Sequence, residues 1–388
     1  MRIGIDVGGT NTDSVLIDGT QIVRKSKTTT TEDITNGVKN SLHAILPSEE
    51  KNLGVDAVMI GTTHFTNALL QKNGLATTAA LRLCLPATQM LPPMVDWPKE
   101  MKESIKGYTY LVDGGFEFDG REISTIDKGQ IRRAVDDMAN KGVEAISISG
   151  IFSSVDPTQE QIAAQIIQEE TPHIKISMSH EIGRVGVLER ENATILNACL
   201  STTSDSVVGA FKKAVEELNL GSALFLTQND GTLMDADFAT KYPVYSISSG
   251  PTNSMRGAAF LTGIQNAIVA DVGGTSTDVG ILRNGFPRES SIAVEIGGIR
   301  TNFRMPDVLS IALGGGSVVN TSPITIGPES VGLQLTQQSL LFGGSIRTTT
   351  DMAAAAGLVN IGNKTLLSEI SEEDIKSSLN MMNVMTED

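Results

Sequence analysis

The sequence predicts an α/β protein built from two related lobes. Three observations lead to this prediction: an eight-residue motif occurs twice, short apolar strands alternate with amphipathic helices, and glycine is abundant while aromatic residues are scarce. Alternating strands and helices are typical of α/β domains. Glycine provides the tight turns in which backbone approaches backbone or a ligand. With 388 residues, the chain is long enough for two or three domains.

The composition excludes several classes of protein. There are 30 Lys and Arg residues against 45 Asp and Glu residues, a formal net charge of −15, whereas nucleic-acid binding needs a cationic face. Apolar runs fall short of the ~18–20 residues of a membrane span, and the first residues lack a signal-peptide pattern. Cys84 and Cys199 form no zinc pattern or disulfide framework, so we expect buried thiols. We therefore expect a cytoplasmic protein without nucleic-acid or membrane partners.

The repeated motif is the main feature of the chain. Residues 6–13 read DVGGTNTD and residues 271–278 read DVGGTSTD, so seven of eight positions are identical. Each copy lies between two short apolar segments, which predicts a strand–turn–strand hairpin. These flanking segments are residues 3–5 and 15–17 for the first copy, and 267–270 and 279–282 for the second.

The residue types of the motif suit a phosphate-binding turn. Paired glycines permit positive φ and let consecutive N–H groups converge on an anion, and threonine hydroxyls add donors. Two such loops would hold a polyphosphate from both sides, whereas two ordinary hairpins are the alternative that the duplication disfavours. A later glycine run, residues 314–316, is also predicted to bind the nucleotide, and its alternative role is tight packing. The residues predicted to bind the nucleotide are Gly8, Gly9, Thr10, Asn11, Thr12, Gly273, Gly274, Thr275, Ser276, Thr277, Gly314, Gly315 and Gly316.

Four carboxylates accompany the two loops. Asp6 and Asp271 end their strands and present hard oxygen ligands of the kind that Mg²⁺ prefers; capping of the adjacent turn is the alternative. Asp13 and Asp278 are equally compatible with Asx-turn closure and with a metal or water contact. One of the four is expected to orient the attacking water, and the pattern leaves open which one.

Strands and helices alternate through the first part of the chain. We expect a helix over 31–46 with Thr31 as its cap, and a strand over 55–60 followed by a turn and a short helix. A strand region over 75–83 precedes a proline-containing stretch, 86–120, which we interpret as an irregular, lid-like insertion.

The same alternation continues, and it predicts a domain boundary before the second motif. We expect a domain over 1–266 and a second over 267–388. The further expected elements are helices over 127–140, from 156, over 187–218 with a break near 201–205, over 253–261 and over 372–381, strands over 143–149, 174–178 and 222–227, and a strand-like stretch over 308–319.

Two turns outside the motif are candidate substrate sites. His64 and Asn67 follow a predicted strand in a Gly/Thr-rich turn, where free N–H groups bind anions, although a structural role is the more common one for a lone histidine. Ser249 and Gly250 precede a predicted helix, where plain capping is the alternative. Residues 189–191 are expected to form a solvated salt-bridge face.

Several segments together resemble a known family. The duplicated hairpin is similar to that of the actin-like ATPase superfamily, which includes sugar kinases and DnaK-type chaperones. Within it, the chain resembles the hydantoinase A/5-oxoprolinase family, and its later segments resemble the hydantoinase-like branch. The segments that carry the resemblance are 4–13, 61–70, 189–194, 249–251, 271–278 and 314–317, and for the branch 327–332, 342–344 and 349–351.

The resemblance implies a fold and a reaction. The implied fold has duplicated ribonuclease H-like lobes, and the implied reaction is ATP- and Mg²⁺-dependent opening of a cyclic amide such as a hydantoin, a lactam or 5-oxoproline. In that chemistry ATP phosphorylates the amide oxygen and water attacks the activated carbon, so the protein positions groups and neutralises charge.

The resemblance also implies a glycine-rich turn for adenosine, beyond the region that this chain covers. Either residues 314–317 take that role, or the second lobe is incomplete and a further C-terminal region or second subunit completes it; we favour the second. A small-molecule kinase and a non-catalytic, nucleotide-gated partner subunit are the alternative functions, and an oligomer remains open.

Overall fold

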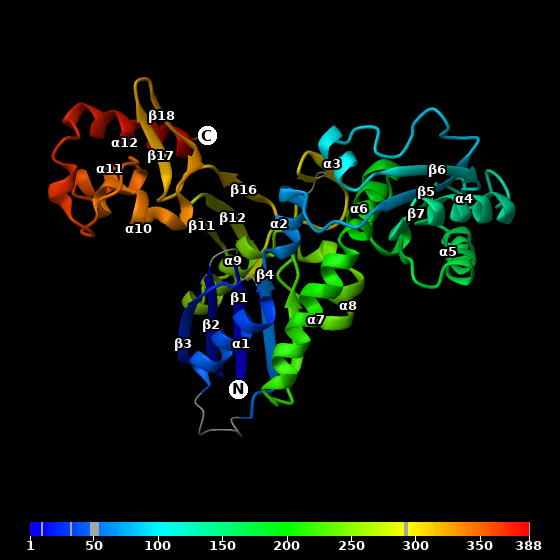
Figure 1. Cartoon of the computed structure of the whole chain (residues 1–388), viewed down its shortest axis with the longest axis horizontal. Helices are drawn as coiled ribbons and strands as arrows, with labels where there is room; N and C mark the ends of the chain where they lie inside the picture. The colour runs from blue at the N-terminus through cyan, green and yellow to red at the C-terminus, as the bar shows by residue number, and fades with distance from the viewer. Residues whose placement is uncertain (9–10, 32, 47–53, 291–293, 388) are drawn as a thin grey trace. The chain divides into compact units, whose positions relative to one another are not determined.

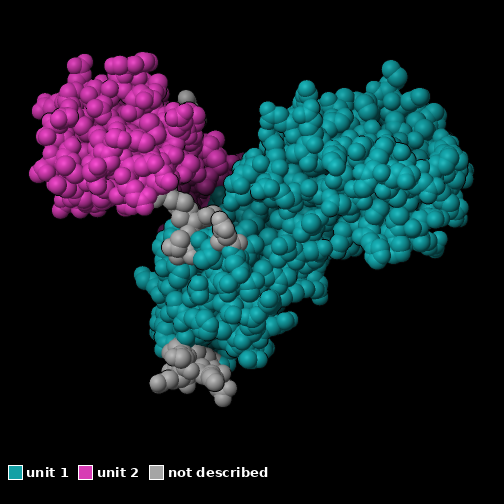
Figure 2. Space-filling view, in the orientation of Figure 1, with its two compact units in different colours: residues 1–253, 289–305 teal, residues 254–288, 306–388 magenta. Residues whose placement is uncertain are grey.

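The chain folds into two compact units. The computed structural model describes residues 1–8, 11–31, 33–46, 54–290 and 294–387. Figure 2 shows unit 1, residues 1–253 and 289–305, and unit 2, residues 254–288 and 306–388. The sequence predicted a division after residue 266, whereas the compact units divide within helix α9 (Ser249–Thr262), and residues 289–305 belong with unit 1.

A six-stranded sheet forms the part of unit 1 that carries the first motif. Its strands lie in the order β10 (Leu233–Asp235), β9 (Ala223–Thr227), β4 (Ala57–Thr62), β1 (Arg2–Val7), β2 (Asn11–Asp18) and β3 (Gln21–Thr29). Strands β1, β4 and β9 are parallel, so their carboxyl ends share one edge. Helix α1 (Ile34–Ile45) packs on β1 to β3 and against α7 (Ser201–Glu217), as Figure 1 shows.

A second, parallel sheet forms the other part of unit 1. Its order is β6 (Tyr108–Asp113), β5 (Thr78–Leu85), β7 (Ala145–Gly150) and β8 (Lys175–Met178). Helices α4 (Lys128–Asn140) and α5 (Thr158–Glu170) pack on one face, and α6 (Val187–Cys199) packs on the other. The remaining elements of unit 1 are α2 (His64–Gln71), α3 (Lys99–Ser104), η1 (Ser179–Glu181), α8 (Ala236–Lys241), η2 (Pro243–Ser246), β14 (Val294–Ile296) and β15 (Ile299–Thr301).

Unit 2 contains the second motif and a small α/β layer. Strands β11 (Ala267–Val272), β12 (Thr277–Arg283), β13 (Phe286–Pro287) and β16 (Val308–Ile311) form one sheet, on which Met255 and Ala259 of α9 pack. The hairpin of β17 (Ser317–Thr321) and β18 (Ile324–Ser330) packs against α12 (Glu372–Glu387). The other elements are η3 (Gly332–Gln334), α10 (Leu335–Gln338), η4 (Leu340–Phe342), α11 (Thr349–Ala355) and η5 (Lys364–Leu367). Among the described residues, no helix combines the length and apolarity of a membrane span.

Two local predictions need correction. Helix α1 begins at Ile34 with Asp33 as its N-cap, because the Asp33 carboxylate accepts from Asn36 N, while Thr31 Oγ1 bonds the Asp33 carbonyl. The stretch predicted as an irregular insertion contains α3 and strand β6, which pairs with β5 as an edge strand. Its prolines precede these elements, so they did not exclude regular structure after residue 98.

Helix α6 is buried from Arg190 to Cys199, and the polar partners of Arg190 and Glu191 lie inside the protein. The sequence predicted a solvated face for 189–191, but Arg190 is 1% exposed and Glu191 is fully buried. Arg82 of β5 donates from Nε to Glu191 Oε1 at 2.8 Å and also bonds Oε2, and Ser149 Oγ donates to Glu191 Oε1 at 2.5 Å. The solvated-face prediction is therefore wrong for Arg190 and Glu191, because partners far away in sequence enclose them, whereas Glu189 is partly exposed and pairs with Arg300 at 3.4 Å.

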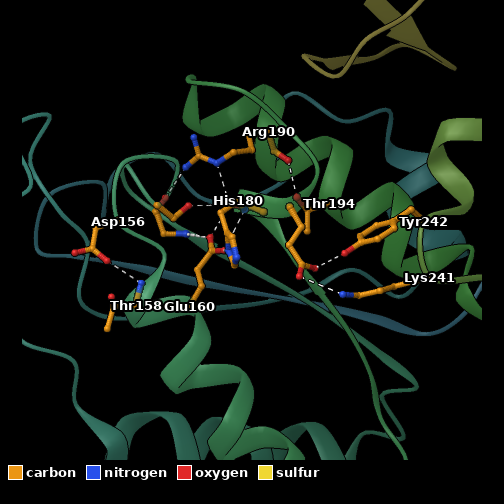
Figure 3. A network of polar contacts seen from close by, with 12 residues as sticks. Asp156, Thr158, Glu160, His180, Arg190, Thr194, Lys241 and Tyr242 are labelled. Atoms are coloured by element: carbon orange, nitrogen blue, oxygen red, sulfur yellow. Dashed lines mark hydrogen bonds and ion pairs between the residues drawn. The ribbon is translucent and has the colours of Figure 1, made fainter. Parts of the chain in front are cut away.

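A second buried network joins α5, η1 and α6 (Figure 3). Glu160 of α5 is fully buried and accepts from Ser179 Oγ at 2.5 Å and from Gly150 N at 2.8 Å, while His180 Nδ1 lies 2.6 Å from its other oxygen. Arg190 Nε donates to Ser179 Oγ at 2.9 Å. Burial by itself raises the pKa of the Glu160 carboxyl, but the hydrogen bonds that the carboxylate accepts lower it by more than burial raises it. The pKa of Glu160 therefore lies below its ordinary value.

We predict that Glu191→Ala destabilises the protein by about 3–5 kcal/mol, because it leaves the Arg82 charge buried without its partner. Urea unfolding monitored by circular dichroism measures the effect. As control, Glu100→Gln removes the exposed ion pair with Lys72 and should leave the urea midpoint nearly unchanged. Equal midpoints for both variants would contradict the structural role of the buried pair.

The Glu160 network predicts a pH dependence of stability. Because its folded-state pKa is depressed, ionised Glu160 stabilises the fold above the ordinary carboxyl pKa of about 4.3, and this contribution is lost as pH falls through the folded-state pKa. We expect the stability difference between the parent protein and Glu160→Gln to be large at neutral pH and to shrink in acid. Urea titrations across this range test it, with the exposed Glu169→Gln as control; a difference independent of pH would contradict it.

Candidate functional site

The two motifs form hairpins of the same construction. In the first, β1 and β2 are antiparallel with Asp6 opposite Asp13, and Gly8 N donates to Asn11 O at 3.0 Å. In the second, β11 and β12 place Asp271 opposite Asp278, and Gly273 N donates to Ser276 O at 2.9 Å. The predicted hairpins are therefore confirmed. Gly9 and Thr10 lie outside the described residues.

The first carboxylate lies in a polar cluster at the strand ends of unit 1. Asp6 is the register partner of Gly61 on β4. A Cβ atom at position 61 would lie 3.0 Å from Asp6 Oδ1 and would overlap the amide of Asn253. That amide donates from Nδ2 to Thr227 Oγ1, at the end of β9, at 3.2 Å. The missing side chain of Gly61 therefore allows a carboxylate, an amide and a hydroxyl to converge.

The sequence analysis missed Asn253 and Thr227 as members of this cluster. Thr227 is the last residue of β9, and the carboxyl ends of parallel strands are where α/β sheets bind ligands. This rule would have drawn attention to Thr227 once β9 was known to be parallel to β4. Asn253 lies within α9, and only the fold brings its amide to Gly61.

A groove on the sheet face extends from this cluster. The groove has a volume of about 650 Å³. Its lining includes Asp6, Asp13, Lys25 and Lys27, and Lys27 Nζ lies 3.1 Å from Asp13 Oδ2. Ligand pockets commonly have volumes of about 300–1,000 Å³, so this groove is large enough for a ligand that contacts the first motif.

Serine donors orient the carboxylates of the second motif. Ser254 Oγ of α9 donates to Asp271 Oδ2 at 2.5 Å, and Ser310 Oγ of β16 donates to Asp278 Oδ1 at 2.5 Å. Among the described residues, no three or more His, Cys, Asp or Glu side chains gather in a metal-binding group. Mg²⁺ is often held by one or two carboxylates together with substrate phosphates, so single carboxylates such as Asp6 and Asp271 fit that ion.

The later glycine run packs directly on the second motif. Gly315 N donates to Gly273 O at 3.0 Å, and Gly316 N donates to Gly274 O at 2.7 Å. A Cβ atom on Gly314 would lie 2.7 Å from Thr275 N. Gly314 and Gly316 are therefore required for close backbone packing, whichever ligand the loop binds, and a Cβ atom on Gly315 would lie 3.0 Å from Thr350 Oγ1.

The hydroxyl groups of the motifs differ in exposure. Thr12 is fully buried, with its Oγ1 3.1 Å from Thr30 Oγ1, and Thr277 Oγ1 donates to Leu313 O at 2.6 Å. Thr275 is exposed. The two buried hydroxyls are thus engaged with the protein. Thr275 is exposed and Asn11 and Ser276 are half-buried, so these three side chains are more accessible to a ligand than Thr12 and Thr277.

His64 and Asn67 both lie in helix α2, of which His64 is the first residue. His64 Nδ1 is 2.6 Å from Thr62 Oγ1, and burial lowers the pKa of its imidazole, which keeps the ring neutral at pH 7. Asn67 Nδ2 donates to Thr63 Oγ1 at 3.3 Å. His64 is thus held beside the end of β4, next to the Asp6 cluster, without a charge.

Ser249 and Gly250 begin helix α9 rather than precede it. Ser249 is 1% exposed, and its hydroxyl has no hydrogen-bond partner within the described structure. The preceding Ser248 has a φ of +61°, and its N–H bonds Thr66 Oγ1 of α2 at 3.3 Å. A positive φ at a non-glycine residue is costly and is often found at functional sites.

The structure is a mixed α/β fold in which each of the two units carries one motif hairpin. The family model for the hydantoinase/oxoprolinase N-terminal region matches residues 2–171, and the hydantoinase/oxoprolinase model matches residues 190–382. The chain belongs to the hydantoinase/oxoprolinase family.

Named relatives cover nearly all of the chain. It is 27% identical to caprolactamase subunit alpha of Pseudomonas jessenii over 93% of its length, and 26% identical to the acetophenone carboxylase gamma subunit of Aromatoleum aromaticum over 92%. These alignments cover 55% and 53% of the relatives, so the chain spans about half of their length. The crystal structure of ATP-dependent caprolactamase from Pseudomonas jessenii has a similar fold, with a TM-score of 0.79 at 23% identity over 99% of this chain and 62% of that one.

The close approach at Gly61 predicts an effect on stability. We expect Gly61→Ala to destabilise unit 1 by about 1–3 kcal/mol, because the added methyl group would displace Asn253 and Asp6. The matched control is Gly209→Ala in α7, where a Cβ meets no atom within 4 Å, and it should stabilise by about 0.5–1 kcal/mol. Urea denaturation compares the two variants; a Gly61→Ala protein as stable as the parent would show that position 61 tolerates a side chain.

Proposed function

We propose that this chain is the ATP-binding part of an enzyme that opens a cyclic amide, such as a hydantoin, a lactam or 5-oxoproline. The observation that carries the proposal is the pair of Asp-Val-Gly-Gly-Thr hairpins, closed by equivalent hydrogen bonds in the two units. Family membership supports it, and relatives of the chain are named caprolactamase and 5-oxoprolinase.

The chemistry explains why ATP is used to open an amide ring. An amide carbonyl is a poor electrophile, because nitrogen donates electron density into it. In the proposed reaction the amide oxygen attacks the terminal phosphorus of ATP and ADP leaves. Water then adds to the activated carbon and the carbon–nitrogen bond breaks, which frees the amine and leaves an acyl phosphate. A second water hydrolyses the acyl phosphate, giving the ring-opened carboxylate and phosphate. The enzyme's contribution is positioning and charge stabilisation.

The residues of the two hairpins have distinct roles in this proposal. The loop N–H groups, with Asn11, Thr275 and Ser276, bind phosphate oxygens. Asp6 and Asp271 would hold Mg²⁺ directly or through its waters, and the bound ion would supply positive charge to the phosphates. Asp13 and Asp278 are candidates to orient water.

We also propose that the active enzyme includes further protein. Relatives are named as alpha, beta and gamma subunits, and the chain spans about half of the first two. A partner subunit or a continuing region would then complete the adenosine contacts or supply the hydrolytic residues, whereas the phosphate contacts that give this chain its own affinity for Mg²⁺-ATP come from its two hairpins. The two buried free thiols, Cys84 and Cys199, support a cytoplasmic location.

Calorimetric titration with Mg²⁺-ATP tests nucleotide binding by the chain itself. We expect saturable binding that Asp271→Asn weakens about tenfold or more, because the variant loses a carboxylate that would hold Mg²⁺ beside the phosphates. The control Asp307→Asn removes a half-exposed carboxylate that pairs with Arg288 in unit 2 and should bind as the parent does. Absence of binding by the folded parent chain, or equal affinity in Asp271→Asn, would contradict the proposal.

A further inference from the structure

The strand that leads into the second motif has a free edge. Within the part of the chain that the structure describes, β11 pairs only with β12. Gly273 N donates to Ser276 O across this pair, and hydrogen-bonded pairs alternate with non-bonded ones in an antiparallel ladder. The backbone N–H and C=O groups of Ile268, Ala270 and Val272 therefore point away from β12, toward the position of a further strand.

The first motif shows how the equivalent edge is filled. Counted from the two motifs, Ile268 and Val272 correspond to Ile3 and Val7 of β1. There the edge is occupied by β4, which runs parallel to β1, and Val7 O accepts from Thr63 N at 3.3 Å. The backbone groups that bind a parallel strand in unit 1 are thus available in unit 2.

The side chains of the two strands differ in the same way. Ile3 and Val7 are 0% and 2% exposed, and α1 packs on β1 and β2. Ile268 and Val272 are 74% and 70% exposed. Helix α9 packs on the other face of this sheet, where Val269 lies. One face of the second sheet is therefore open, although its counterpart in the first sheet is part of the core.

The open face is apolar and uncharged. The strand register places Val279, Ile281 and Leu309 on the same face as Ile268 and Val272, and Leu309 is also exposed. Proteins commonly protect an edge strand with Lys or Pro, but residues 267–272 read AIVADV and contain neither. In a chain with a net charge of −15, such a surface suits an apolar, uncharged polypeptide segment.

The repeat also favours one occupant over another. A second copy of this chain, related by a two-fold axis, would place its own β11 antiparallel to the first. The equivalent edge of β1 instead holds a parallel strand from elsewhere in the sequence. The comparison therefore favours a strand that is not another β11.

We propose that β11 binds an apolar strand of another polypeptide as its parallel neighbour, by addition to the sheet edge. In the register of β4 on β1, Gly61 lies opposite Asp6, and its missing side chain leaves room for the carboxylate. The added strand correspondingly has a glycine opposite Asp271. This inference rests on the proposed function, since it locates where the further protein of the enzyme joins this chain and completes the second motif.

A peptide with the sequence of β4 provides the probe. Residues 55–63, VDAVMIGTT, form the strand that occupies the equivalent edge. Hydrogen exchange of the full chain, followed by mass spectrometry, should show fast exchange at the amides of Ile268, Ala270 and Val272. Saturating peptide should slow this exchange about tenfold or more. A peptide with leucine in place of Gly61 should bind about tenfold more weakly, because its side chain would meet Asp271.

Two variants of the edge and one control test the location. Ile268→Lys replaces an exposed side chain, so the fold is kept, and it should weaken the peptide about tenfold by removing apolar contact and adding a charge. Ala270→Pro removes the central N–H donor of the edge and should abolish the protection. The control is Val23→Lys, at a 47% exposed residue of β3, the edge strand of the first sheet, and it should respond to the peptide as the parent does.

Unchanged exchange at millimolar peptide, or an equal response of Ile268→Lys and the parent, would overturn the proposal. Slow exchange in the chain alone would also overturn it, and a dimer in sedimentation would then identify a second copy as the occupant. Equal binding of the leucine peptide would overturn the assignment of glycine. Titration of the same protein with Mg²⁺-ATP separates the two proposals: nucleotide binding without strand addition rejects only this inference, whereas strand addition without nucleotide binding rejects the proposed function.

Discussion

The buried pairing of Arg82 with Glu191 is the constraint on which unit 1 depends. Both side chains are fully buried, so neither charge is tolerable unless β5 and α6 are held together. Helix α6 is enclosed from Arg190 to Cys199, and its apolar residues belong to the same core as β1, β4 and α7. The pair therefore connects the second sheet to the core beneath the first motif. A buried ion pair contributes little net stability, but loss of one partner is costly.

At the two motifs, polar groups lie close together because glycine has no side chain. At Gly61, the lack of a Cβ atom leaves room for Asp6 and Asn253. At Gly314 and Gly316, it leaves room for the backbone of the second loop. In both places polar groups come closer than any residue with a Cβ would permit. At these positions glycine therefore corresponds to specific close contacts in the structure.

The sequence allowed correct prediction of features that depend on local pattern. The two hairpins, the helix over 127–140, the break between α6 and α7, and the burial of both cysteines are all present. Features that depend on distant partners were not predictable. Arg190 and Glu191 have a composition typical of a solvated helix, and only the enclosing sheet shows that they are buried. Likewise, Asn253 and Thr227 join the Asp6 cluster through tertiary structure alone.

The docking of residues 314–316 on the second loop has a further consequence for the energetics of binding. The carbonyl oxygens of Gly273 and Gly274 are held by backbone N–H groups, and Ser330 Oγ adds a bond to Gly274 at 3.2 Å. The conformational entropy of ordering this loop is thus lost during folding rather than on encounter with a ligand. An anion that binds it meets a preorganised receptor, and more of the contact energy appears as affinity.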